Sequence, residues 1–308
     1  MSACAALSPD SFAAAVPEVI ELTDDERAGP AGAALDHEQT KFRSLLSEGE
    51  YDAALESAKL AVALTSQVWG TESNQLGQAL TNLAIAQTEV NNFPAAQQNF
   101  EAAIRVYEQA ERSLVSSELI NPLRGLADTQ IAMSQYEAAI PLFERAIHIS
   151  HVTDGPTNLQ QIQDMDALSR AHFFSGSAAR ATSIQEKMYR LQQRKFSANS
   201  EGYAEALDRR ANWFTEIGDF TQATYTLRRL ERVLGETYGR DDPRLIPVLI
   251  RLSFVANKQA DGPTTLTPEI AEKEARRAIN RAVRIARTQA EDNPQLLART
   301  LTQRGDFL

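Results

Sequence analysis

The chain has 308 residues, of which 43% are hydrophobic and 23% are charged, a globular composition that excludes global disorder. Its formal net charge of −10 argues against nucleic-acid binding, because the long-range field repels phosphates. The single cysteine excludes a disulfide framework and a zinc site built from cysteines. No stretch approaches the roughly 18 apolar residues that a membrane-spanning helix needs.

The first 34 residues contain no repeat and are predicted to form a flexible leader, because they are rich in Ala, interrupted by Pro and acidic over Glu21–Glu26. Within this leader, Ser2-Ala3-Cys4-Ala5-Ala6-Leu7 resembles the end of a bacterial lipoprotein signal, in which the cysteine becomes lipidated. A lipid on Cys4 would anchor the protein to a membrane surface without a spanning helix. The alternative is that Cys4 is an incidental residue of a disordered tail.

From residue 35 onward the chain repeats with a period of about 42 residues. An aromatic residue followed by alanine three positions later recurs, and a degenerate copy replaces the aromatic residue with Ala178. The alanines are Ala54, Ala96, Ala139, Ala181 and Ala223, at spacings of 42, 43, 42 and 42 residues. A turn precedes each copy and an amphipathic stretch precedes each turn, so each unit is predicted to be helix, tight turn, helix.

These units resemble the tetratricopeptide repeat, and their period is similar to that of kinesin light chain. The matching elements are the turn, the aromatic residue, the alanine and a small residue on the first helix, which is Ala84, Ala127, Ser169, Ala211 or Ser253. The resemblance implies an all-α fold, a right-handed α-solenoid of stacked antiparallel helix pairs. It covers residues 35–308 as a single solenoid of six repeats plus the first helix of a truncated seventh.

The sixth unit departs from the period, since its alanine, Ala275, follows Ala223 by 52 residues. The ten extra residues, 260–269, contain two prolines and a glycine and are predicted to form a loop. The pattern restarts after Pro294 and stops in mid-helix at Leu308. Because a solenoid normally ends in a polar capping helix, we expect the sequence to be a fragment of a longer protein.

No phosphate-binding loop, nucleophile elbow or metalloprotease helix is present, so we expect no enzyme activity, no catalytic residue and no cofactor. His148 and His151 could share a metal with His172, but no carboxylate stands at ligand spacing, and a structural or solvated pair is preferred. A stripe of arginines follows the sixth-repeat loop: Arg276, Arg277, Arg281, Arg284 and Arg287. It alternates with apolar residues, which favours a solvated helix face over a site for an acidic partner.

In tetratricopeptide-repeat proteins the first helices line a concave groove that binds peptides, and the resemblance therefore implies a set of groove residues. They are Gln78, Thr81, Asn82, Ile85, Glu89, Arg124, Asp128, Asp166, Arg170, Phe173, Asp208, Arg209, Asn212, Arg251 and Phe254. Asn212 with two of the arginines partly fits the carboxylate-binding pattern of some members, but the lysines of that pattern are missing. An internal peptide, held by apolar anchors and by arginines that favour an acidic partner, is therefore expected.

The sequence thus predicts a non-catalytic scaffold that binds a protein or peptide and no nucleic acid, and that meets a membrane only through a lipid on Cys4. Its expected location is the bacterial periplasm or envelope, with the cytoplasm as the alternative. A second hypothesis is that the chain is the repeat region of a longer protein, such as a TonB-type energy transducer, whose activity lies beyond Leu308. The sequence does not determine the oligomeric state.

Overall fold

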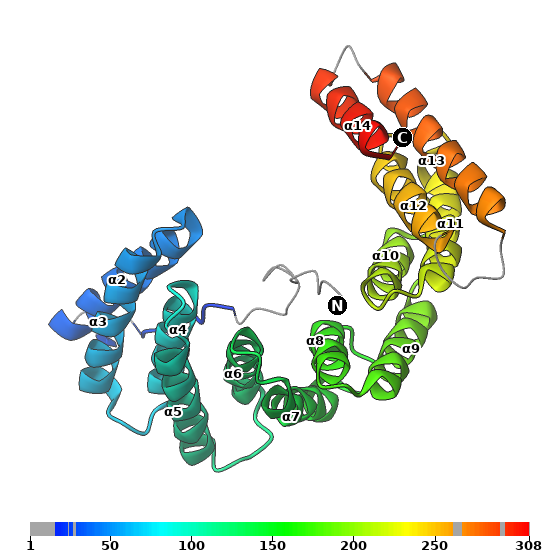
Figure 1. The fold of residues 1–308 in the computed structure, drawn as a ribbon. Helices are drawn as coiled ribbons and strands as arrows, with labels where there is room; N and C mark the ends of the chain where they lie inside the picture. The colour runs from blue at the N-terminus through cyan, green and yellow to red at the C-terminus, as the bar shows by residue number, and fades with distance from the viewer. Residues whose placement is uncertain (1–15, 24, 27–28, 261–266, 290–292, 308) are drawn as a thin grey trace. The chain divides into compact units, whose positions relative to one another are not determined.

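The computed structural model describes residues 16–23, 25–26, 29–260, 267–289 and 293–307. Their regular structure is helical, as predicted (Figure 1). The helices are α2 (Pro30–Glu48), α3 (Tyr51–Trp69), α4 (Asn74–Glu89), α5 (Phe93–Glu111), the 3₁₀ helix η2 (Ser117–Leu119), α6 (Ile120–Ala132), α7 (Tyr136–Asp154), α8 (Gln161–Phe174), α9 (Ala178–Lys195), α10 (Glu201–Glu216), α11 (Phe220–Tyr238), α12 (Leu245–Ala260), α13 (Pro268–Thr288) and α14 (Pro294–Phe307).

The turn inside each of the first five helix pairs requires a left-handed residue two positions before the second helix. Gly49, Asn91, Ser134, Gly176 and Gly218 fill this position, with φ of 81°, 58°, 60°, 85° and 76°. Glycine adopts this conformation without a steric penalty and asparagine tolerates it. Glycine is therefore not required in every turn, and Asn91 and Ser134 take its place in the second and third repeats.

The predicted repeat register is confirmed by burial. The anchor alanines Ala54, Ala96, Ala139, Ala181 and Ala223 are all fully buried, and so is Ala275 in the sixth repeat. The small residues predicted on the first helices are also buried. Small side chains at both positions let the two helices of a pair approach closely.

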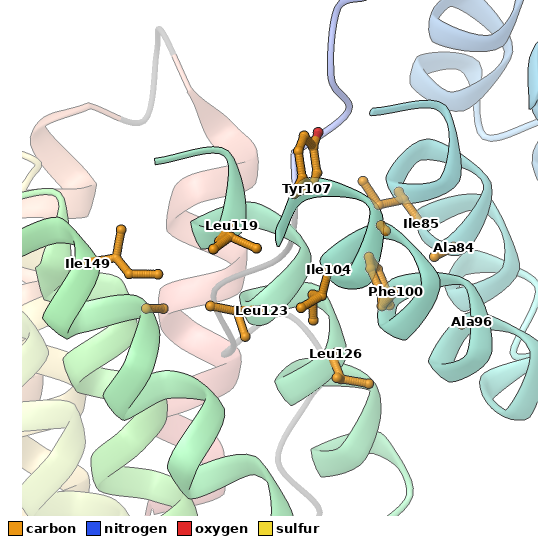
Figure 2. Close-up of a cluster of buried hydrophobic side chains, with 12 residues drawn as sticks. Ala84, Ile85, Ala96, Phe100, Ile104, Tyr107, Leu119, Leu123, Leu126 and Ile149 are labelled. Carbon is orange, nitrogen blue, oxygen red and sulfur yellow. The ribbon is translucent and has the colours of Figure 1, made fainter. Parts of the chain in front are cut away.

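The chain divides into two compact units, one up to Met188 and one from Tyr189 onward. In the first unit, each helix pair packs on the next, and the second repeat shares a hydrophobic cluster with α6 and α7 (Figure 2). Phe100 and Ile104 of α5 lie in this cluster beside Leu123 and Leu126 of α6. A single pair could not bury these faces, so stacking supplies the core.

The sixth repeat of the second unit contains a break where the extra residues were predicted. Helix α12 ends at Ala260 and α13 begins at Pro268, while residues 261–266, the middle of the expected loop, lie outside the described part of the chain. Helix α14 follows, at the place of the predicted seventh first helix.

Candidate functional site

Residues 16–23 of the leader lie without regular secondary structure against α2, α4 and α6 of the first unit, in dark blue beside α4 in Figure 1. Asn82 of α4 accepts a hydrogen bond from the backbone N–H of Glu18 (2.6 Å) and donates one to the carbonyl of Glu18 (2.8 Å). Asn121 of α6 binds both main-chain groups of Val16 in the same way, at 2.9 and 2.5 Å. Each of these two side-chain amides thus binds both the N–H and the carbonyl of one leader residue.

Gln39 of α2 makes the third contact, since its Oε1 accepts a hydrogen bond from the N–H of Ile20 (3.0 Å). Its buried Nε2 has no hydrogen-bond partner among the described residues. We call Gln39, Asn82 and Asn121 the amide row. The row contacts residues 16, 18 and 20, and this two-residue spacing is that of an extended chain.

Side chains of this segment alternate between the helices and the solvent. Ile20 and Leu22 are buried, whereas Val19, which precedes Ile20, is 50% exposed and Glu21, which lies between the two, is also exposed. Pro17, which has no N–H, falls on an outward position where no amide donor is needed. The alternation and the main-chain contacts together place one edge of the segment on the amide row.

The side chain of Glu18 points toward the helices and is bound at both oxygens. Oε2 accepts a hydrogen bond from the Tyr107 hydroxyl (2.7 Å), and Oε1 accepts one from Nδ2 of Asn121 (3.1 Å). Burial nevertheless raises the pKa of Glu18, and the charge on Glu118 acts in the same direction. The contacts that the described residues make with the carboxyl are thus hydrogen bonds from a hydroxyl and an amide.

Tyr107 reaches Glu18 from the second helix of its repeat. Figure 2 shows its hydroxyl pointing away from the other labelled hydrophobic side chains. A Cβ atom on Gly77 of α4 would come within 2.8 Å of the tyrosine ring, so only glycine leaves room for the ring at this point. Burial and the nearby Glu18 carboxylate raise the pKa of Tyr107, which keeps its hydroxyl protonated as the donor.

Leu22 enters a hydrophobic cluster between α2 and α3 that contains Leu35 and Ala61, with Leu64 and Trp69 packed against it. The apolar contact of the segment is therefore made with the first repeat. Further along, Glu26 accepts a hydrogen bond from the indole of Trp69 (2.6 Å).

Of the predicted groove residues in the second repeat, Asn82 is the one that contacts the leader's main chain. Thr81 is buried and donates to the carbonyl of Gly77 (2.9 Å), and Ile85 packs in the core cluster instead of lining a binding surface. Gln78 is half-buried and Glu89 is exposed.

In the third and fourth repeats the predicted groove arginines pair with carboxylates of the same unit. Arg124 forms a two-pronged ion pair with Asp164 (2.6 and 2.9 Å), which is not among the predicted groove residues. Arg170 pairs with Asp166 at 3.0 Å. Burial raises the pKa of Asp128 well above its usual range. The remaining predicted residue, Phe173, packs edge-to-face on Phe174.

The second unit repeats this pairing. Arg251 binds Asp208, and Arg209 lies 3.8 Å from Glu205. Phe254 is half-exposed, with the Lys258 ammonium 6.0 Å from its ring, while Asn212 is half-buried. Each arginine expected to meet an acidic partner thus already has a carboxylate partner within its own unit.

The other candidate sites have ordinary structural roles. His151 is hydrogen-bonded to Gln161, His172 is buried, and the described residues contain no group of three potential metal ligands. In the arginine stripe, Arg281 and Arg284 pair with carboxylates of the preceding repeat. No helix of the described ranges is long and apolar enough to cross a membrane. Cys4 lies outside these ranges, so its lipidation and the envelope location stay predictions.

The sequence pattern did not predict the role of Gln39, Asn121, Tyr107 or the leader segment itself. Repeat register puts Gly125, not Asn121, at the position of Asn82, so an alignment of the repeats does not find the amide row. The usable signal was Ile20-Glu21-Leu22-Thr23 in the leader, where apolar and polar residues alternate as is typical of an extended segment with one buried side.

The tetratricopeptide repeat family model matches residues 43–109. Kinesin light chain TPR-like repeats from Podosopora anserina superpose with a TM-score of 0.60 at 16% identity, over 68% of this chain and 99% of that one. BtubC (BKLC) from P. vanneervenii superposes with a TM-score of 0.54 at 15% identity, over 85% and 92%. No curated protein matches the sequence. At these identities the structural likeness concerns the fold alone.

Proposed function

We propose that this chain, a tetratricopeptide-repeat protein with kinesin-light-chain-like repeats, is a non-catalytic scaffold that binds an extended segment of a partner protein along the amide row. The observation that carries the proposal is the leader itself, whose main chain lies on Gln39, Asn82 and Asn121 at every second residue. A side-chain amide both donates and accepts, which matches the N–H and carbonyl of an extended chain. Main-chain recognition of this kind is open to other segments.

The proposal predicts that the row binds a peptide supplied separately. Because the leader occupies the row, the test needs the full chain with its leader weakened, and we define the released variant as Glu18→Ala/Ile20→Asp/Leu22→Asp. It lacks the carboxyl and places charges at two buried positions. A fluorescent peptide with the sequence of residues 16–23 is the probe, and binding is measured by fluorescence anisotropy.

The released variant is expected to bind this peptide, and adding Asn82→Ala and Asn121→Ala should weaken binding by at least tenfold, since five hydrogen bonds are removed. Asn280→Ala, an exposed amide on α13, is the matched control and should leave binding unchanged. A melting curve of each variant checks that the solenoid is folded. Absence of binding to the folded released variant, or equal binding with and without the two amides, would overturn the proposal.

A further inference from the structure

We infer that the amide row also selects side chains, so that the partner segment carries glutamate followed at two-residue spacing by two aliphatic residues, Glu-x-Ile-x-Leu. This inference rests on the proposed function and adds the chemical class of the ligand. It comes from the three inward side chains of the leader: Glu18 is hydrogen-bonded by Tyr107, Leu22 lies in a hydrophobic cluster, and Ile20 is buried.

The glutamate position is the most specific of the three. Its two oxygens accept hydrogen bonds from Tyr107 and Asn121, and Gly77 makes room for the tyrosine ring. An apolar side chain at this position would remove the acceptor of the Tyr107 hydroxyl and of the Asn121 amide. Because the site is buried, water would not replace the lost hydrogen bonds. The site therefore discriminates by hydrogen-bond acceptors at glutamate length and does not depend on an arginine.

The two apolar positions follow from burial. Ile20 is 3% exposed and Leu22 is 8% exposed, with Leu22 in the cluster formed by Leu35 and Ala61. Charged side chains there would lose their hydration without a counter-ion. In contrast, Val19 and Glu21 are exposed, so these two positions of a ligand are free to vary.

The leader is an exchangeable occupant of this site. Its residues 16–23 have no regular secondary structure, and amide side chains hold the main chain at residues 16, 18 and 20. It also leaves the buried Nε2 of Gln39 without a partner among the described residues, which costs binding free energy. A partner segment that satisfies this donor as well as the three side-chain positions would displace the leader.

The test compares variants of the residue 16–23 peptide on the released variant. Replacing Glu18 by Ala should weaken binding by about tenfold, while Glu18→Gln, which keeps an acceptor at the same length, should stay within about threefold. Ile20→Asp and Leu22→Asp should each weaken binding by more than about tenfold. The outward replacements Val19→Ala and Glu21→Gln are the matched controls and should leave binding unchanged.

A second comparison links the glutamate to its donor. Tyr107→Phe in the released variant should weaken binding of the unsubstituted residue 16–23 peptide and leave binding of the Glu18→Ala peptide unchanged. This double-mutant cycle isolates the contact between Glu18 and Tyr107. Wild-type chain should rank the peptides identically but bind each of them more weakly, because its leader competes. Equal binding of all the peptides would overturn the side-chain selection while leaving the proposed function intact. Failure of every peptide to bind would overturn both.

Discussion

The first helices carry two kinds of polar side chain: neutral amides in the first three repeats, and paired charges in the third to sixth. In α4 and α6, Asn82 and Asn121 hold the main chain of another segment. In α10 and α12, Asp208 and Arg251 pair with each other. Opposite charges on neighbouring helices satisfy one another, whereas a neutral amide keeps a donor and an acceptor for a ligand. A row of amides on a helix face therefore indicates a binding site more strongly than a face that carries charges of both signs.

The same contrast bears on the charge of the partner. Arginines predicted to attract an acidic partner are engaged by carboxylates, as Arg124 is by Asp164. Glu18, whose side chain the leader sets against the helices, is bound by a hydroxyl and an amide. Hydrogen-bond geometry and burial, rather than net charge, set the preference that we propose.

The largest difference between the units is expected when an ion pair is broken. Arg124→Ala leaves Asp164, whose side chain is 1% exposed, without its partner, and should lower the free energy of unfolding by about 3 kcal/mol. Arg251→Ala breaks a pair whose side chains are 31% and 43% exposed, and should cost about 1 kcal/mol or less. Urea denaturation followed by circular dichroism measures both. Equal losses would contradict the burial difference.

Two glycines in helices provide the next comparison. Gly77→Ala should cost about 1–3 kcal/mol of unfolding free energy, because the new Cβ strikes the ring of Tyr107. Gly235→Ala in α11 meets no atom within 4 Å and should stabilise the protein by about 0.5–1 kcal/mol, since alanine favours the helix. Urea midpoints of the two variants test this. Equal stability of the two variants would contradict the close contact between Gly77 and the Tyr107 ring.

Removing one amide should loosen the leader without unfolding the solenoid. Asn82→Ala deletes both hydrogen bonds to Glu18 and should weaken docking by about 1–2 kcal/mol. Cleavage after Glu18 by a glutamyl endopeptidase should then be roughly tenfold faster, because it follows the population of the open segment. The control variant Asn280→Ala should be cleaved at the wild-type rate. Unchanged cleavage of Asn82→Ala would contradict a docked leader.

The smallest effect concerns pH. Burial raises the pKa of docked Glu18 above its ordinary 4.5, with Glu118 adding to the shift and the hydrogen bonds from Tyr107 and Asn121 opposing it. The protonated form therefore favours docking, which is strongest below pH 4.5 and weakens as the pH rises through the docked pKa. The released variant should bind the residue 16–23 peptide more tightly at pH 4.5 than at pH 7.5. The Glu18→Gln peptide should show no such change, and a reversed dependence of the parent would contradict the burial of Glu18.

Helix pairs and their register were predictable, because close packing allows only small residues at Ala54, Ala96 and Ala139 in every repeat. The break after α12 was predictable from prolines and glycine in the inserted residues. Both are local or periodic constraints, which appear directly in a single sequence.

The amide row was not predictable from the repeats. Asn121 lies one helical turn before the position that corresponds to Asn82, so no period relates the two residues. Their common role arises only because residues 16–20 run across several helices. Contacts between Glu18 and Tyr107, 89 residues apart, depend on tertiary structure that composition and spacing do not contain.

Hydrogen exchange of the leader's own amides tests the central claim most directly. In the wild-type chain, residue-resolved exchange measured by NMR should show slow exchange for the N–H groups of Val16, Glu18 and Ile20, which the amide row binds. Val19 and Glu21, on the outward edge, should exchange at the rate of an open chain, and Asn82→Ala should remove the protection of Glu18. Uniformly fast exchange over residues 16–23 in the wild type would contradict the account.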